Sequence, residues 1–263
     1  MSSTVINPSP ARGRFAQLRL HLPTVPEALA SLLRTITVAL FLLTFVLQPQ
    51  FIPSESMEHT LLVGDFLLVN KQIFAPGESE HSLGRWIMPH RPVSRGDIVV
   101  FHHPNPPYLV KRVVGAPGDR IRIEDGRVWV NGVVQDEPYA AFEPTEPNPF
   151  RDDFPAKIYS DPQVDPGWWR QMQSLTRNGD LVVPPDEYFV LGDNRNHSLD
   201  SRFWGFVPRQ AIVARPLVIY FSLRRPSTTD VQQAADDRLG SDRVLSARLI
   251  GFARWKRIFH VVH

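Results

Sequence analysis

An apolar stretch near the N-terminus constrains this chain more than any other feature of its sequence. Residues 28–47 read ALASLLRTITVALFLLTFVL and contain one charged side chain, Arg34. At about 1.5 Å per residue, a helix of this length spans about 30 Å, the thickness of the hydrocarbon core of a bilayer. Arg34 lies near one end, where its long side chain can reach the headgroups. The sequence therefore predicts a transmembrane helix over residues 28–48.

The charges that flank this stretch predict its orientation. By the positive-inside rule, the basic segment over residues 1–27 stays in the cytoplasm and everything after Gln48 lies outside. We therefore expect a single-pass protein of the cytoplasmic (inner) membrane, with its main part on the outer or periplasmic side. The residues before the stretch carry three arginines against one acid: Arg12, Arg14, Arg19 and Glu27.

A buried core helix and a cleaved signal peptide would share this apolar character. The uncharged part, residues 35–47, lies beside arginines and is followed at once by Pro49 and Pro53, which is unusual for a core helix. A signal peptide would be followed by a small-x-small cleavage site, and residues 48–51 supply none. An uncleaved anchor is therefore the interpretation that fits best.

Composition narrows the chemistry of the rest of the chain. A net charge of +2 gives no reason to expect nucleic acid as a partner. The absence of cysteine excludes disulfides, thiolate metal sites and a cysteine nucleophile. None of the 9 histidines has convincing metal-ligand spacing, so no metal and no cofactor are expected. The 25 prolines favour short strands joined by irregular loops over a helical bundle.

Alternating polar and apolar residues predict a mainly β structure for the outer part. Residues 119–123 alternate with period two, and the dipeptides Asp125-Gly126 and Asn131-Gly132 supply two hairpin turns. This pattern predicts a β-meander. Further strands are expected over residues 97–101, 108–114, 127–130, 133–134, 180–183, 188–191 and 211–223.

Differences in composition divide the outer part into regions. Residues 135–180 are acidic, aromatic and rich in proline with little periodicity, which predicts an inserted accessory region. The β domain then comprises residues 49–134 and 181–225, and residues 226–263 hold a polar connector and a basic amphipathic segment. That last segment suits a membrane interface, although a final element packed on the core with an exposed basic face would have the same sequence character.

Two kinds of side chain in the outer part can act as nucleophile and base. Ser54 and Ser56 follow the apolar stretch by a few residues, although a serine in such a place is usually a solvated loop residue. Lys111 lies inside an apolar run over residues 109–114, although a lysine is usually an exposed charge. Desolvation there would lower the pKa of the lysine, and a neutral amine can remove the proton of a serine hydroxyl.

A dense polar segment over residues 192–202 is the third unusual feature. It reads GDNRNHSLDSR and lies between two β-rich stretches. A simple turn would not need this many polar side chains. An elaborate loop held by Asp–Arg pairs would have the same composition, and for part of the segment we favour that interpretation.

Together these segments resemble type I signal peptidases, the serine–lysine dyad family of bacterial leader peptidases. Their order and spacing fit the family from Pro49 to about Leu223, and residues 254–258 resemble its C-terminal segment. The resemblance implies a mainly β fold, with an antiparallel β-sheet catalytic domain and an inserted accessory region after one transmembrane helix. The matching segments are PSESM (53–57), GDFLLVNK (64–71), RGDIVVF (95–101), KRVVGAPGD (111–119) and GDNRNHSLDSRFWGFVP (192–208).

The resemblance also implies a role for individual residues. Ser56 matches the nucleophile and Lys111 matches the general base. Ser54 matches a side-chain donor that joins the Ser56 backbone N–H in the oxyanion hole, where charge develops on the carbonyl oxygen. Ser198 matches a hydroxyl that orients the lysine amine. These roles describe a serine endopeptidase that works through an acyl-enzyme on Ser56.

Substrate and partners follow from the same resemblance. The expected reaction is removal of N-terminal signal peptides from exported preproteins after small residues, typically Ala-x-Ala. The expected partners are those preproteins and the lipid bilayer, with transient proximity to the export translocon. Asp200 and Arg202 match a supporting ion pair. The apolar residues expected to line shallow substrate pockets are Ile52, Met57, Val100 and Val110.

The sequence departs from the family pattern at two positions. Glu55 and His59 stand where many members carry glycine and proline, and neither side chain is needed for the proposed chemistry. His59 suggests a serine–histidine pair instead. It follows Ser56 by three residues, and a base that close can rarely approach the nucleophile in the right direction. We therefore interpret both residues as tolerated variation.

Two other classes of protein are alternatives. A self-cleaving repressor protease with a serine–lysine pair would need a DNA-binding domain and no anchor, and this chain has the opposite. A membrane-tethered binding module that keeps the fold without catalysis should have lost Ser56 or Lys111, and both are present. The endopeptidase interpretation accounts for more of the sequence than either.

Overall fold

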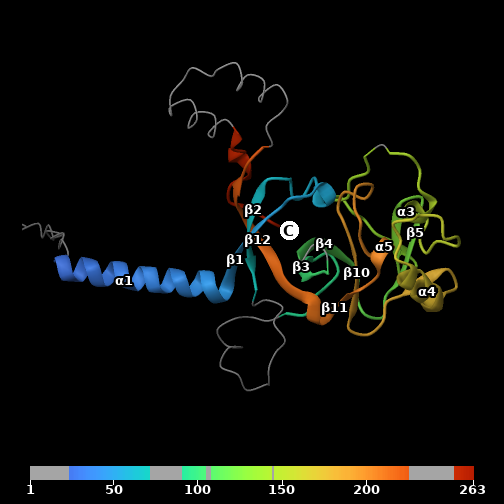
Figure 1. Cartoon of the computed structure of the whole chain (residues 1–263), viewed down its shortest axis with the longest axis horizontal. Coiled ribbons are helices and arrows are strands. Elements are labelled where there is room, and N and C mark those ends of the chain that lie inside the picture. The colour runs from blue at the N-terminus through green and yellow to red at the C-terminus, as the bar shows by residue number, and fades with distance from the viewer. Residues whose placement is uncertain (1–23, 72–90, 105–107, 144, 225–251) are drawn as a thin grey trace, which may run out of the picture. The chain divides into compact units, whose positions relative to one another are not determined.

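A computed structural model describes residues 24–71, 91–104, 108–143, 145–224 and 252–263 of the chain (Figure 1). The three arginines of the N-terminal segment, the whole of the predicted polar connector and the basic segment up to residue 251 lie outside the described residues. The chain divides into two units, Met1–Phe41 and Leu42–His263.

The first unit contains the predicted apolar helix. Helix α1 (Val25–Phe41) continues into a short π-helical turn, Leu42–Val46. Within the described residues one helix, Val25–Thr44, is long and apolar enough to cross a bilayer, with a mean hydropathy of 1.6. None of the residues of α1 is buried, which distinguishes it from a core helix. The helical conformation ends before Leu47, since Pro49 cannot continue a helix.

The second unit is built on an antiparallel sheet whose strands follow the order β1-β2-β12-β3-β4-β10-β11, with β13 paired to β12. This confirms the predicted mainly β fold with an antiparallel sheet. Long β12 joins two halves of the sheet because it pairs with β2 along one part and with β3 along another. The strands are β1 (Leu47–Phe51), β2 (Asp65–Asn70), β3 (Ile98–His102), β4 (Tyr108–Gly115), β10 (Glu187–Leu191), β11 (Val207–Pro208), β12 (Ile212–Ser222) and β13 (His260–Val261).

A second sheet has the order β7-β6-β5-β9-β8. The predicted turns at Asp125-Gly126 and Asn131-Gly132 join β5 to β6 and β6 to β7, and all four residues have positive φ. The strands are β5 (Arg120–Glu124), β6 (Arg127–Val130), β7 (Val133–Val134), β8 (Thr176–Arg177) and β9 (Asp180–Val182).

The second sheet takes strands from both sides of the predicted boundary at residue 135. Two helices of the predicted inserted region, α3 (Pro149–Asp152) and α4 (Pro166–Leu175), lie beside it at one end of the unit (Figure 1). Aromatic burial holds this part together where the sequence shows no periodicity. Its core includes the buried side chains of Phe150, Phe154, Trp168, Met172, Phe189 and Phe203.

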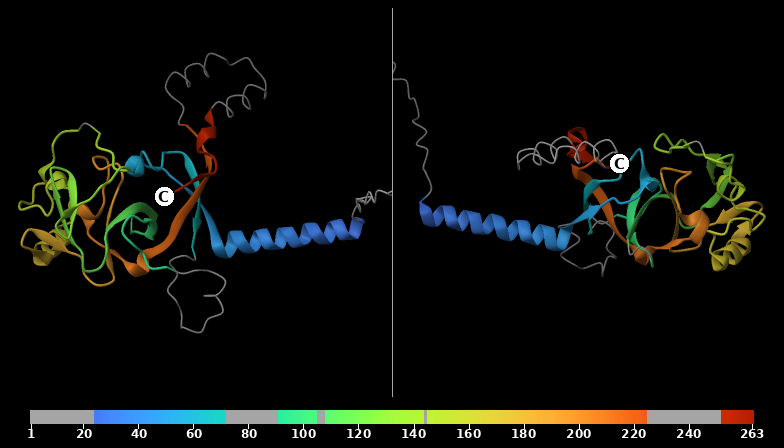
Figure 2. Two further views of the ribbon diagram at one scale, coloured as in Figure 1. Left: turned by 180° about the vertical axis from the view of Figure 1, so that it is seen from behind. Right: turned by 45° about the horizontal axis from the view of Figure 1, so that its top comes forward.

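The described part of the C-terminal segment packs on the large sheet. Strand β13 pairs with β12, and Arg257 forms an ion pair with the buried Asp65 at 2.6 Å. Figure 2 shows the short helical turn Trp255–Arg257 beside the end of β12. Trp255 and Phe259 nevertheless stay 60% and 78% exposed. Packing on the core and contact with a membrane interface are therefore compatible for this segment.

Candidate active site

The predicted nucleophile lies in a tight turn directly after β1. Ser56 is buried within a 3₁₀ helix, Glu55–Met57, whose N-cap is Ser54. The first N–H groups of such a helix have no acceptor inside it, so the Ser56 N–H can point to a substrate carbonyl. The Ser54 hydroxyl lies 3.4 Å from Ser56 Oγ and does not cap the helix. The two groups predicted to form the oxyanion hole, the Ser56 N–H and the Ser54 hydroxyl, therefore lie on the same turn.

The structure brings Lys111 to the nucleophile. Lys111 lies on β4 opposite Val99 of β3 and is 2% exposed. Its Nζ donates a hydrogen bond to Ser56 Oγ at 2.5 Å. The two side chains lie 55 residues apart in the sequence, and the sheet makes them neighbours.

Burial decides the protonation of this lysine. Desolvation lowers the pKa of Lys111 to about 8, the carboxylates of Asp200 and Asp193 oppose that change, and the Arg202 guanidinium adds to it. A substantial fraction of the amine is therefore neutral slightly above neutral pH, as a general base requires.

The polar segment over residues 192–202 packs directly behind the Ser56–Lys111 pair. Asp193 accepts two hydrogen bonds from Arg112, at 2.8 and 2.7 Å, and one from Thr60 Oγ1 at 2.5 Å. The N–H of Asn194 donates to the Ser56 carbonyl at 3.1 Å. The segment therefore connects the turn of the nucleophile to the strand of the base.

The predicted Asp200–Arg202 pair is present and buried. Arg202 donates to both carboxylate oxygens of Asp200 at 2.8 Å, and Asp200 also accepts from the Gly192 N–H at 3.1 Å. Arg202 Nη2 reaches the Arg195 carbonyl at 2.8 Å. This pair begins the short helix α5 (Ser201–Trp204) and fixes the path of the polar segment.

The structure does not show the contact that was predicted for Ser198. Its hydroxyl is buried near the site, but no described residue forms a hydrogen bond with it. The expected bond between Ser198 and the Lys111 amine is therefore absent from this structure, and its orienting role stays a prediction.

Ser198 and Ser56 meet at Gly192. A Cβ built on Gly192 would lie 2.3 Å from Ser198 Oγ and 2.4 Å from the Ser56 carbonyl oxygen. Only a residue without a side chain fits between these two atoms. Glycine at this position therefore allows the backbone of the polar segment to lie close to the Ser56 turn.

A cleft of about 370 Å³ opens over the Ser56–Lys111 pair. Three of the four predicted pocket residues line it: Ile52, Met57 and Val110. Val100 does not line it and is buried in the core of the large sheet. Sequence reasoning missed several other lining residues: Leu199 and Trp204 lie in the matching segment 192–208, where the prediction concerned the polar residues, and the others lie outside the matching segments. The missed residues are Gln50, Phe51, His103, Tyr108, Leu109, Leu199 and Trp204.

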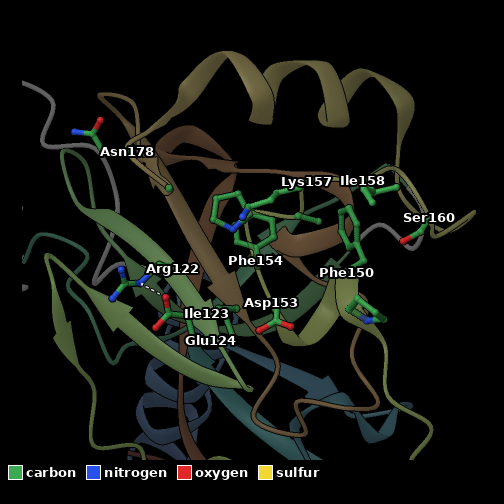
Figure 3. Close-up of a pocket in the computed structure, with 14 residues that line it drawn as sticks. Arg122, Ile123, Glu124, Phe150, Asp153, Phe154, Lys157, Ile158, Ser160 and Asn178 are labelled. Atoms are coloured by element: carbon green, nitrogen blue, oxygen red, sulfur yellow. Dashed lines mark ion pairs between the residues drawn. The ribbon is translucent and has the colours of Figure 1, made fainter.

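A larger hollow of about 730 Å³ lies in the second sheet, away from this cleft. Figure 3 shows Lys157 and Phe154 among its lining residues, and Arg122 paired with Glu124. Neither Ser56 nor Lys111 lines it. Its size therefore gives no reason to move the candidate site.

Comparisons with known proteins give the family of this chain. The family model described as "Signal peptidase, peptidase S26" matches residues 26–221. The chain belongs to this family. Signal peptidase I of Leptolyngbya laminosa is 34% identical over 86% of this chain and 95% of its own. Signal peptidase I of Aquifex aeolicus is 35% identical over 77% of this chain and 87% of its own.

Membership of the signal peptidase family makes this chain a peptidase of the kind that removes signal peptides, and it confirms the resemblance. Signal peptidase I of Pseudomonas aeruginosa is 32% identical over 80% of this chain. A solved signal peptidase I from Enterococcus faecalis covers 48% of this chain and 97% of its own at 30% identity. Its TM-score of 0.36 is too low to bear on the fold.

Among the described residues, Ser56 Oγ accepts a hydrogen bond from Lys111 and lies near Ser54, and no histidine forms a hydrogen bond with it.

Proposed function

We propose that this signal peptidase is a membrane-anchored serine endopeptidase that uses Ser56 as nucleophile and Lys111 as general base. The observation that carries the proposal is the 2.5 Å contact between the Nζ of the buried Lys111 and the Oγ of Ser56. A lysine buried at hydrogen-bond distance from a serine hydroxyl has the geometry and the lowered pKa that a base for serine requires.

The reaction proceeds through an acyl-enzyme. Neutral Lys111 takes the hydroxyl proton of Ser56 as Oγ attacks the carbonyl carbon of the scissile bond. The Ser56 N–H and the Ser54 hydroxyl stabilise the oxyanion. The Lys111 ammonium then protonates the departing amine, and the mature protein leaves. Lys111 next activates a water that hydrolyses the ester and restores the Ser56 hydroxyl.

Two exposed strand edges support binding of the leader in an extended conformation. Strand β1 is at the edge of the described sheet, and β4 pairs with β10 only from Arg112 onward, so residues 108–111 have β3 on one side alone. Both segments line the cleft. A peptide strand can add to such edges by backbone hydrogen bonds. The preference for small side chains of the Ala-x-Ala type is carried over from the family.

A direct assay tests this proposal. The full-length protein in detergent is incubated with a preprotein bearing an Ala-x-Ala site, and the new N-terminus is mapped by mass spectrometry. We expect a single cut immediately after the second alanine. Failure to cut, or a cut elsewhere, would contradict the proposed specificity.

The pH dependence of cleavage should report the lowered pKa of Lys111. Because the base acts only when neutral, kcat/KM is expected to fall about tenfold per pH unit below pH 8 and to level off above it. Initial rates between pH 6 and 10 on a peptide without titratable groups near the cleavage site measure this profile. A profile that reaches its plateau near pH 6 would contradict a lysine base with a pKa of about 8.

The apolar helix predicts how the protein partitions in cells. The chain is expected to stay in the membrane pellet after alkaline extraction, with its N-terminal residues intact by mass. Protease added outside spheroplasts is expected to digest the part that follows Gln48. A shortened soluble chain would instead indicate a cleaved signal sequence.

A further inference from the structure

A short segment of the predicted accessory region, residues 137–141, reaches the back of the catalytic centre. Glu137 accepts hydrogen bonds from both terminal nitrogens of Arg195 at 2.7 Å, and the two side chains are 8% and 2% exposed. The Ala141 N–H donates to the Asp193 carbonyl at 2.7 Å, and the Arg195 N–H donates to the Ala141 carbonyl at 2.9 Å. The segment is therefore paired with residues 193–195 through both side chains and backbone.

Tyr139 adds a contact with the strand of the base. The guanidinium of Arg112 lies 3.8 Å from the centre of the Tyr139 ring, and the Tyr139 hydroxyl donates to Glu137 at 3.1 Å. Burial and the Glu137 carboxylate raise the pKa of this hydroxyl, so it stays a donor at neutral pH. An aromatic face is a favourable partner for a desolvated guanidinium, and the ring covers Arg112 in addition to its hydrogen bonds to Asp193 and the Gly96 carbonyl.

Each partner of this segment is next to a catalytic group. Arg112 follows Lys111 directly on β4 and holds Asp193 through two hydrogen bonds. The residue after Asp193 donates its N–H to the Ser56 carbonyl at 3.1 Å. A displacement of Arg112 or of residues 193–195 would therefore move Lys111, Ser56 or both.

We infer that residues 137–141 act as a positioning strap, which holds Arg112 and residues 193–195 so that Ser56 and Lys111 stay in contact. This inference rests on the proposed serine–lysine mechanism and adds a role in catalysis for the accessory region. None of the five residues is among the described residues that line the cleft. The strap should therefore affect the rate of the chemical step and leave substrate binding unchanged.

Tyr139→Leu in the full-length protein tests the strap. Removing the ring uncovers one face of the Arg112 guanidinium, which its hydrogen bonds to Asp193 and to the Gly96 and His263 carbonyls then hold alone. We expect kcat to fall about tenfold with KM within about twofold of the wild type, because small misplacements of catalytic groups are costly. Tyr139→Phe keeps the ring over Arg112 and should restore kcat to within about threefold. The matched control is Tyr159→Leu, since Tyr159 also lies in the accessory region and has one hydrogen bond and one ring contact, neither to the catalytic segments.

Thermal unfolding of each variant separates positioning from folding. The inference is overturned by an unchanged kcat in Tyr139→Leu, by an equal loss in Tyr159→Leu, or by a loss confined to KM. If Tyr139→Leu does not fold, Glu137→Gln replaces it, with the same expected fall in kcat. Wild type and Ser56→Ala accompany every assay: an inactive wild type or an active Ser56→Ala contradicts the proposed mechanism, whereas normal behaviour of both with an unaffected Glu137 or Tyr139 variant contradicts only the strap.

Discussion

Ser56→Ala and Lys111→Ala are each expected to abolish leader cleavage, with a loss of at least about 1,000-fold in kcat/KM. Ser56→Ala removes the oxygen that forms the acyl-enzyme. Lys111→Ala removes the amine that takes its proton, and no histidine among the described residues bonds Ser56 as a replacement. Initial rates on an Ala-x-Ala preprotein measure both losses.

Two exposed residues of the larger hollow provide matched controls. Ser160 and Lys157 line it together, away from the cleft (Figure 3). Ser160→Ala and Lys157→Ala remove the same chemical groups and should leave cleavage within about twofold of the wild type.

The choice of variant at position 111 separates chemistry from packing. Lys111 is 2% exposed, so alanine also leaves a cavity, whereas methionine keeps most of the volume and cannot act as a base. Lys111→Met should therefore be as inactive as Lys111→Ala but more stable in thermal unfolding. Lys111→His should be nearly as inactive, because the imidazole side chain is shorter than that of lysine and places its basic nitrogen at a different position relative to Ser56 Oγ. Appreciable processing by any of these variants would contradict the lysine mechanism.

Physical patterns in the sequence were sufficient for part of the fold. The hairpins at Asp125-Gly126 and Asn131-Gly132 were predictable because both dipeptides tolerate positive φ, and the structure has positive φ at each of them. The burial of Lys111 was predictable from the apolar run around it. These features depend on neighbours in the sequence, which is why a single chain reveals them.

Other features depend on contacts between distant residues. Strand β1 reads LQPQF and follows the apolar helix without a break, so nothing in its own sequence marks it as a strand. Its pairing with β2 makes it one. Neighbouring residues in the sequence likewise do not predict the contact of Tyr139 with Arg112. They also do not predict that Ser198 Oγ has no hydrogen-bond partner among the described residues. The assignment of Ser56 as nucleophile came from the family resemblance and stays a prediction.

Gly192→Ala is expected to lower kcat/KM by at least about 100-fold while the protein stays folded. The added methyl would lie 2.3 Å from Ser198 Oγ and 2.4 Å from the Ser56 carbonyl oxygen, distances that no Cβ tolerates. Rotation of the Ser198 hydroxyl does not relieve the conflict, because Ser198 Cβ would itself lie 2.5 Å from the added methyl, and the Ser56 carbonyl belongs to the backbone of the nucleophile turn. The conflict must therefore move Ser56, Ser198 or residues 192–194, and displacements of about 1 Å are enough to cost this much rate.

Gly115→Ala is the matched control, because it too adds a methyl to a crowded backbone position. Gly115 lies on β4 with Lys111, and its added Cβ would lie 2.8 Å from a terminal side-chain carbon of Ile121. That contact is with a flexible side chain in the core, so Gly115→Ala should lower the thermal midpoint while kcat stays within about threefold of the wild type. Gly192→Ala also lowers the midpoint, because its conflict includes backbone, but it should lose far more kcat for each degree of lost midpoint. The two variants could instead lose the same amount of kcat for each degree by which the thermal midpoint falls. Gly192 would then matter for folding alone, and its contact with the Ser56 carbonyl would have no part in catalysis.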